Sequence, residues 1–184
     1  MNAAPFLRRG FAWLIDATAV SVLAAAFAWH WIAPATSASL LATHALQDLA
    51  AHRLVDGLVA GTPPMAMVQA LLHDPAMLLA AARVQDALWS LLVPWTLAYA
   101  VLAFAWHVGG DLSPWRGSPG KHWLGLRVEA IDGGMPTVRQ AMLREAGSAL
   151  SWLTLNLGHA LALLPPRRQS LHDRLAGTQV RAAR

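Results

Sequence analysis

The sequence predicts an all-α integral membrane protein with two clear transmembrane helices, a third membrane or re-entrant helical element, amphipathic helices in the outer loop and a small cytoplasmic β element. The composition is the first reason, because 56% of the 184 residues are hydrophobic and only 13% are charged, against roughly 25% charged in a soluble domain. Two long apolar stretches and a mean hydropathy of +0.41 are the others. The length favours a single membrane domain over residues 1–184.

The first predicted span, residues 11–33, contains one acidic residue, Asp16, and no basic residue. Its length covers the ~30 Å hydrocarbon core of a bilayer. An ionised Asp within such a helix costs roughly 2.5–3.5 kcal/mol, so we expect a partner for the charge or a use for it. Arg9 is the nearest candidate partner, because a separation of nearly two helical turns places both side chains on one face.

The second predicted span, residues 87–106, has no formally charged residue, and Pro94 within it is expected to kink the helix. The third apolar stretch, residues 146–164, is also uncharged but contains the polar or flexible residues Asn156, Gly158 and His159. These residues accommodate a break. The stretch therefore either crosses the membrane or enters it and returns.

The distribution of basic residues predicts the orientation. Of 14 Lys and Arg, only Arg53 and Arg83 lie in residues 34–86. The positive-inside rule then places the N-terminus and residues 107–145 in the cytoplasm and residues 34–86 outside. The basic tail, residues 165–184, favours the cytoplasm too, which favours a re-entrant third element. We expect a multi-pass protein of the cell inner membrane that contacts anionic lipid at its cytoplasmic face and binds no nucleic acid.

The extracytoplasmic insert, residues 34–86, is predicted to form a small helical cap. Apolar residues recur at helical spacing between residues 40 and 58. Breaks are expected at Asp56-Gly57 and at residues 61–64, and a second amphipathic stretch covers residues 65–72. A turn is then predicted at residues 73–75, where the sequence reads His-Asp-Pro.

The cytoplasmic segment is predicted to carry the β element. Residues 124–131 favour a strand that ends in a turn at residues 132–134, and Thr137 suits the N-cap of a following helix. Residues 177–180 are expected to pair with residues 126–128 if the tail is cytoplasmic. That pairing brings Asp173 beside the membrane surface.

Four motifs in order resemble the RDD family of bacterial membrane proteins. They read RRGFAWLID, GSPGKHWLGLRV, a DGG-x-P turn before RQAMLRE, and SLHDRLAGTQV. The family is named after one arginine and two aspartates, and Arg9 and Asp16 fall on the first two positions while Asp173 is the expected third. The resemblance implies a membrane fold, with transport of unknown ligands proposed for the family and cation/proton antiport suggested for some members.

Two functional hypotheses follow from these residues. In the first, Arg9, Asp16 and Asp173 form a polar membrane site that transports a proton, an ion or a small ligand. In the second, the Arg/Asp cluster is structural and the chain is a non-catalytic membrane assembly or interaction protein. Both expect a homo-oligomer or a membrane protein partner. Supporting positions for the polar site are Asn156, His159, Lys121 and Arg174.

The sequence offers little for an enzyme, a cofactor or a metal. Its lack of Cys excludes disulfides and thiolate sites. The GSPGK motif fails the phosphate-loop pattern, because His122 follows Lys121 where Ser or Thr is needed. The motif is therefore interpreted as a turn with Lys121 at the lipid head groups. We expect no catalytic residue, no metal site and no cofactor.

Overall fold

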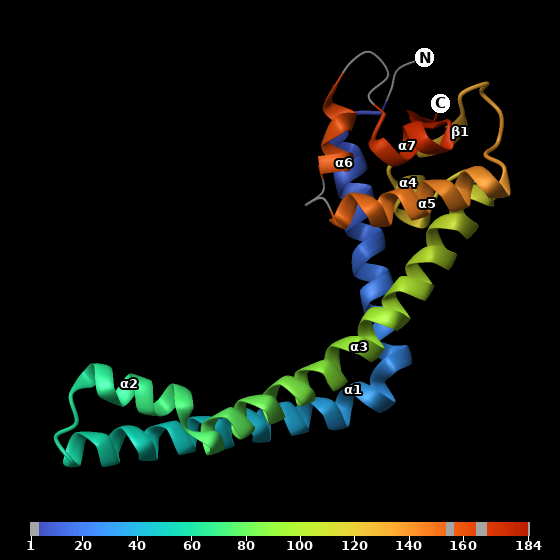
Figure 1. The fold of residues 1–184 in the computed structure, drawn as a ribbon. Coiled ribbons are helices and arrows are strands. Elements are labelled where there is room, and N and C mark those ends of the chain that lie inside the picture. Colours follow the sequence, from blue (N-terminus) through green and yellow to red (C-terminus); the bar gives the residue numbers. More distant parts are fainter. Residues whose placement is uncertain (1–3, 154–156, 165–168, 184) are drawn as a thin grey trace. The chain divides into compact units, whose positions relative to one another are not determined.

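The computed structural model describes residues 4–153, 157–164 and 169–183. The chain is mostly helical and divides into two compact units, one of residues 1–23 with 99–184 and one of residues 24–98. Figure 1 labels the α-helices and β1, and its colours follow the chain. In order the elements are α1 (Phe6–Val59), α2 (Pro64–His73), α3 (Pro75–Leu112), α4 (Pro119–Trp123), β1 (Leu126–Ala130), α5 (Val138–Leu153), α6 (Leu157–Ala160), η1 (Leu161–Leu163), α7 (Leu171–Ala176) and β2 (Thr178–Ala182).

Helix α1 joins the predicted first span to the predicted outer helix without a break. It contains 54 residues, or about 81 Å at 1.5 Å per residue, so it is much longer than a ~30 Å hydrocarbon core. The prediction of a helix break at Asp56-Gly57 is wrong. One Gly costs a helix only about 1 kcal/mol, and at Gly57 the missing side chain lets Met67 of α2 pack closely, since an added Cβ would lie 2.9 Å from its Cε.

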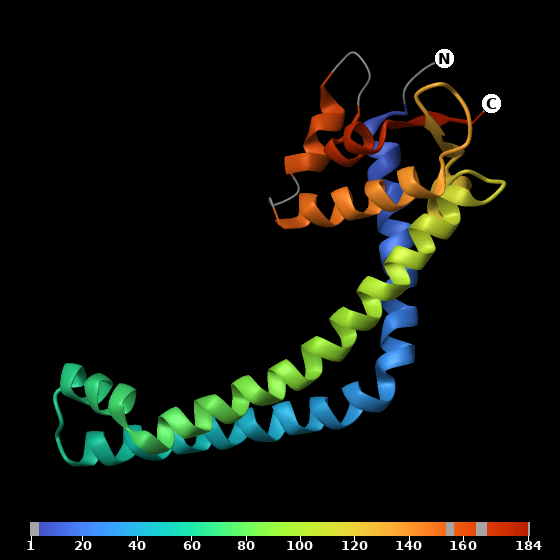
Figure 2. The ribbon, with the colours of Figure 1, turned by 45° about the vertical axis from the view of Figure 1, so that its right-hand side comes forward.

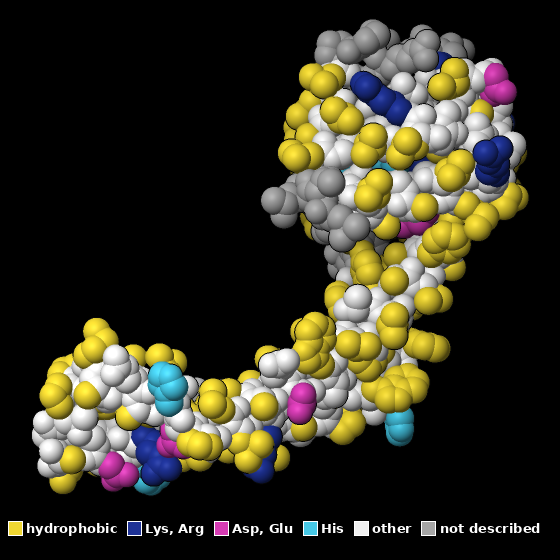
Figure 3. Space-filling model, viewed as in Figure 1, with side chains coloured by type: hydrophobic (Ala, Val, Ile, Leu, Met, Phe, Trp, Pro, Cys, Tyr) yellow, Lys and Arg dark blue, Asp and Glu magenta, His cyan; other side chains and the backbone are white. Residues whose placement is uncertain are grey.

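The unit of residues 24–98 is a helical hairpin. Its turn spans residues 60–63, as the break expected at residues 61–64 required, and Asp74 separates α2 from α3 as the His-Asp-Pro turn predicted. Arg53 Nε donates to Asp74 Oδ2 at 2.7 Å and ties α1 to that turn. Within this unit, Figure 3 shows charged and His side chains gathered toward the α2 end.

Helix α3 contains the predicted second span and extends beyond it at both ends, over 38 residues. Gly109-Gly110 lies inside the helix. At Gly110 the missing Cβ allows the backbone of Ser118 to approach, since an added Cβ would lie 2.7 Å from its Cα. The most apolar 18-residue windows of α1 and α3 are only 28% and 11% buried. Both helices are long and apolar enough to cross a membrane, and their apolar side chains point outward.

The unit of residues 1–23 and 99–184 contains the predicted β element. Strands β1 and β2 pair antiparallel, with Val128 opposite Val180, which confirms the predicted pairing of residues 126–128 with the tail. Ala4 N–H donates to the Val180 carbonyl at 3.2 Å, so the chain just before α1 lies along β2. Ala4 and Ala12 pack with Leu126 and the two valines in a small core. In Figure 2 the strands lie beside α7, above α5.

Helix α5 begins where the sequence predicted. Gln140 N–H donates to Thr137 Oγ1 at 3.3 Å, and Thr137 N–H donates to Gln140 Oε1 at 2.9 Å, which together form a capping box. The apolar stretch 146–164 is not one straight helix in its described part. Its first half is the end of α5, and after the undescribed residues 154–156 the chain continues as the short helices α6 and η1. Gly158 packs onto Ser151 and Leu171, so α6 folds back against α5 and α7.

Candidate functional site

Asp16 is 1% exposed, and its carboxylate is held by neutral donors. Trp106 Nε1 donates to Oδ1 at 2.9 Å, the Gly120 backbone N–H donates to Oδ1 at 2.8 Å, and the Ser118 hydroxyl donates to Oδ2 at 2.5 Å. These three hydrogen bonds offset the loss of water from the buried carboxylate. Asp16 forms no ion pair with another described residue, so its expected pairing with Arg9 is not what the geometry shows.

The GSPGK motif therefore acts as the receptor for Asp16. Its Ser118 and Gly120 supply two of the three donors, and α4 begins between them. An added Cβ at Gly120 would lie 2.4 Å from the Ala12 carbonyl oxygen of α1 and 2.9 Å from both Cγ and Oδ2 of Asp16, closer than side-chain carbons approach in folded proteins. Glycine is needed at this position because the backbone N–H must touch the carboxylate.

A second cluster is a chain of alternating charges from five helices. Arg9 of α1 donates to Asp173 Oδ2 of α7 at 2.5 Å, and Arg144 Nε of α5 donates to Asp173 Oδ1 at 3.0 Å. Arg144 Nη1 also donates to Asp111 Oδ2 of α3, whose Oδ1 accepts from Lys121 Nζ of α4 at 3.2 Å. The order is Arg9–Asp173–Arg144–Asp111–Lys121. The predicted residues Arg9 and Asp173 are thus joined, whereas Asp16 lies in its own receptor.

Arg144 and Asp111 were missed from the sequence. Each is buried, with side chains 7% and 3% exposed. Arg144 lies in RQAMLRE beside the expected membrane stretch, and Asp111 lies shortly after the second predicted span, which ends at residue 106. The signal that points to them is a charged residue at the edge of an apolar segment, a pattern that also describes ordinary head-group anchors.

The ion pairs dominate the protonation state of Asp173. Burial alone would raise its pKa, but the charges of Arg144 and Arg9 outweigh burial and hold the pKa well below its usual range. Burial also opposes the charge of Arg144, yet Asp111 and Asp173 raise the pKa of Arg144 above its ordinary value. The side chains of Asp173 and Arg144 are therefore charged at neutral pH.

Asp173 also builds its own helix terminus. Ser170 and Asp173 form a capping box at the start of α7, in which the Ser170 backbone N–H donates to Asp173 Oδ2 at 3.2 Å. One carboxylate therefore belongs both to the capping box of α7 and to the chain of charges. Arg174, expected to support the site, is exposed, and it points away because α7 buries the face that carries His172 and Asp173.

Two histidines lie next to this chain of charges. The rings of His159 and His172 have centroids 4.9 Å apart, and their Nε2 atoms lie 3.5 Å from the Ser148 hydroxyl and 2.8 Å from the Ser170 hydroxyl respectively. Burial lowers the pKa of His172 to about 3. His172 is therefore neutral, and its 3.7 Å approach to Asp173 is not an ion pair.

Lys121 does not lie at the surface as the turn interpretation expected. Its side chain is 14% exposed and bonded to Asp111. Burial and the charge of Arg144 lower its pKa, while Asp111 acts against them. The reason is the fold of GSPGK around Asp16, which turns the next side chain inward. Asn156, also expected to support the site, lies outside the described residues.

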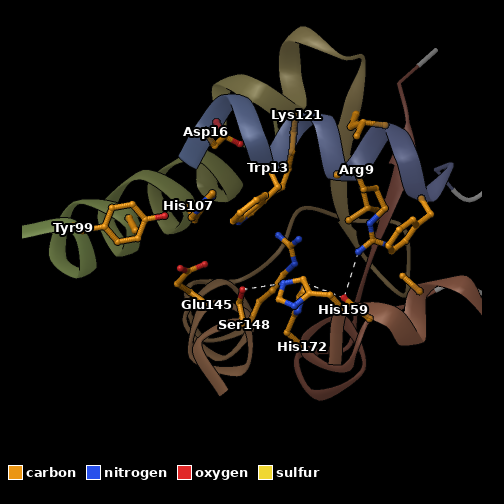
Figure 4. A pocket seen from close by; sticks show the side chains of 18 residues that line it. Arg9, Trp13, Asp16, Tyr99, His107, Lys121, Glu145, Ser148, His159 and His172 are labelled. Carbon is orange, nitrogen blue, oxygen red and sulfur yellow. Dashed lines mark hydrogen bonds between the residues drawn. The ribbon is translucent and has the colours of Figure 1, made fainter. Parts of the chain in front are cut away.

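A cavity of about 270 Å³ lies within the unit of residues 1–23 and 99–184, and side chains of both clusters line it. Figure 4 shows them converging from α1, α3, α5, α6 and α7. The lining includes Arg9, Trp13, Asp16, Tyr99, His107, Lys121, Arg144, Glu145, Ser148, His159 and His172. Its walls are partly aromatic and partly charged. Over the described residues, no group of three or more His, Asp or Glu side chains is arranged to hold a metal ion.

Comparison with protein-family models matches residues 3–177 to the RDD family. The match covers nearly the whole chain and includes all the residues named above for the receptor of Asp16 and for the chain of charges. No curated protein and no solved structure matches the sequence.

Proposed function

The chain belongs to the RDD family, and from this premise we propose that it is a small multi-pass protein of a bacterial inner membrane that takes an ion or a small ligand into its polar cavity. Family membership and the two apolar helices point to a membrane protein. The observation that carries the proposal is the cavity of about 270 Å³, lined by charged and aromatic side chains. A concave site with a few convergent polar groups is the usual form of a small-ligand site.

The buried charges support this function indirectly. Removing several charged groups from water costs several kcal/mol each, and a hydrophobic core would hold the helices together without that cost. In our proposal the two clusters fix the cavity wall in one conformation. Asp16 and Asp173 then act as the supports of the site, while the ligand contacts the side chains between them.

The proposed orientation has both termini in the cytoplasm. Ala4, strand β2 and the end of α3 all belong to one compact unit, which supports a common side for these segments. A reporter enzyme fused after Arg184 should be active in the cytoplasm. An external signal would contradict the orientation and the re-entrant third element together.

A flux assay tests the proposed function. Purified protein reconstituted in vesicles should carry ions in response to a pH gradient, and Asp16→Asn should reduce this flux strongly, because the uncharged amide replaces the acceptor of three hydrogen bonds. Asp86→Asn, an exposed carboxylate in α3, is the matched control and should keep the flux. Equal flux for both variants, with Asp16→Asn still folded by thermal melting, would refute a role for the site in transport.

The second candidate function is a structural or assembly role. One observation favours it: Arg9, Arg144 and Lys121 each have a carboxylate partner inside the protein. In this case the clusters give the fold its specificity and the exposed apolar helices contact another membrane protein or a second copy of the chain. Cross-linking in the membrane should then capture one defined partner, with no flux from the reconstituted protein.

A further inference from the structure

Glu145 is the acidic residue of the cavity that neither cluster uses. It follows Arg144 on α5 and lines the cavity with Tyr99 and Trp13. Within the described part of the chain, Glu145 makes no hydrogen bond and no ion pair, in contrast to Asp16, Asp111 and Asp173. Figure 4 shows its carboxylate on the side of the cavity where Tyr99 and His107 lie.

The charges around the cavity balance without Glu145. The cations are Arg9, Lys121 and Arg144, and the three aspartates of the two clusters supply three negative charges. The neutral state of His172 adds nothing to this sum. An ionised Glu145 therefore leaves one negative charge in excess in a partly buried site, where an uncompensated charge is costly. A proton or one bound cation removes the excess.

The cavity walls indicate which kind of cation fits. Phe6, Trp13 and Tyr99 contribute aromatic rings to the lining, and aromatic faces attract ammonium groups through their quadrupoles. A hard divalent metal cation takes about six or more oxygen ligands, whereas the side-chain oxygens of this lining are the hydroxyls of Tyr99, Ser148 and Ser170 and two carboxylates. One of these carboxylates, Asp16, already accepts three hydrogen bonds. The cavity, about 270 Å³, is near the lower limit for ligand pockets, so the ligand is small.

We propose that Glu145 is the anionic anchor of a binding site for a small organic ammonium ion, whose apolar part lies against Phe6, Trp13 and Tyr99. The inference rests on the proposed function, since it assigns a ligand class to the same cavity. In this assignment Glu145 binds the ligand, and Arg9, Asp16 and Asp173 hold the cavity walls in place around it. An anion would meet cations that are already paired, whereas an ammonium ion meets the unpaired carboxylate.

A proton competes with this ligand. Burial raises the pKa of Glu145 to about 7, and the charges of Lys121 and Arg144 act against that rise. The titratable and charged groups around Glu145 come from every neighbouring helix. They are Arg9 and Asp16 of α1, Tyr99, His107 and Asp111 of α3, Lys121 of α4, Arg144 of α5, His159 of α6 and His172 of α7. Binding is therefore expected to strengthen as the pH rises through about 7.

Calorimetric titration of the full-length protein in nanodiscs tests the inference. The probes are choline and its neutral carbon analogue 3,3-dimethylbutan-1-ol, which share one shape and differ in charge. At about pH 8 choline should bind and the alcohol should not, and Glu145→Gln should weaken choline binding about ten- to a hundredfold. Trp13→Leu should weaken it by about the several-fold expected for a cation–π contact. Asp132→Asn, in an exposed turn, is the matched control and should bind as the native protein does.

Four results would overturn the inference. Choline binding that is the same in Glu145→Gln, with Glu145→Gln folded by thermal melting, would exclude the anchor. Equal binding of the alcohol, or displacement of choline by an equal concentration of sodium, would exclude the ligand class, and so would a native protein that binds no choline. The proposed function fails differently, because ion flux that is unaffected by Asp16→Asn contradicts transport through the site whatever choline does.

Discussion

Arg144→Gln is the substitution that should damage this protein most. Arg144 is 7% exposed and links the two halves of the charge chain, donating to Asp173 at 3.0 Å and to Asp111. Gln keeps part of the length but removes the charge and the fork of donors. Asp173 then keeps Arg9 and Asp111 keeps Lys121, so the remaining charges still balance, but each buried carboxylate loses one of its two cations.

The expected cost follows from the burial of both partners. Removing one member of a buried ion pair costs about 3–5 kcal/mol, because the charge left behind is desolvated and unpaired. Here Asp173 and Asp111 each lose one of two cations and keep the other. We therefore expect the substitution as a whole to lower the free energy of unfolding by about 4 kcal/mol. A chain of this length loses about 2–4 °C of melting temperature per kcal/mol. The predicted decrease is therefore about 8–16 °C.

Intrinsic tryptophan fluorescence during thermal melting in detergent measures this decrease, since the chain contains nine Trp. Arg139→Gln is the matched control, because Arg139 is an exposed residue of the same helix and its loss should change the melting temperature little. Arg144→Lys should fall between the two, since an ammonium group cannot reach both carboxylates as a guanidinium does. A melting temperature for Arg144→Gln equal to that of Arg139→Gln would refute the role assigned to the charge chain.

Three further predictions concern single positions. Gly120→Ala should cost about 1–3 kcal/mol, because its Cβ would lie 2.4 Å from the Ala12 carbonyl oxygen and 2.9 Å from the Asp16 carboxylate. Gly109→Ala, with open space around it, should not destabilise. Equal melting temperatures for the two variants would contradict the close packing of Gly120 against α1. Burial raises the pKa of Glu145 from 4.5 to about 7, so the folded state retains a proton that the unfolded state releases, and the resulting stabilisation is present below about pH 4.5 and lost as the pH rises through 7. Glu145→Gln should therefore be more stable than the native protein at about pH 8, by up to about 3 kcal/mol in the free energy of unfolding. If the melting temperatures of the native protein and of Glu145→Gln depend on pH in the same way, this pKa is wrong. Thr137→Ala should lower the free energy of unfolding by about 1 kcal/mol, because α5 loses its N-cap. Thr137→Ser keeps the capping hydroxyl and should retain the native stability. An equal loss of stability in both variants would exclude the cap.

The sequence predicted the elements that rest on local patterns. The turn at Asp74, the helix start at Thr137 and the strand pair were found because turn residues, a capping side chain and β-branched residues signal them directly. The continuous helix α1 was missed because Asp56-Gly57 carries the same signal whether the helix ends there or passes through. What decides is Met67, which packs against Gly57 from another helix, and no local pattern contains that contact.

The site was predictable only as a set of residues. The apolar surroundings of Asp16 showed that its charge needs compensation, but Arg9 was the expected partner because it is near in sequence. Ser118 and Gly120, about one hundred positions later, satisfy Asp16 instead. Hydrogen-bond donors from a backbone turn have no sequence signature of their own, so this receptor was interpreted as a plain turn.

The two aspartates for which the family is named are therefore not equivalent, and the difference determines what their substitution does. Asp16 is held by three neutral donors, so Asp16→Asn removes a charge without leaving an unpaired cation beside it. Asp173 lies between Arg9 and Arg144, so Asp173→Asn leaves two guanidinium groups facing each other without the carboxylate that separated them. Because like charges repel most strongly where water is excluded, we expect Asp173→Asn to disturb the fold more than Asp16→Asn does. The charge balance of the cavity does not distinguish the two substitutions, because each removes one negative charge, so the predicted difference depends on which donors surround each carboxylate.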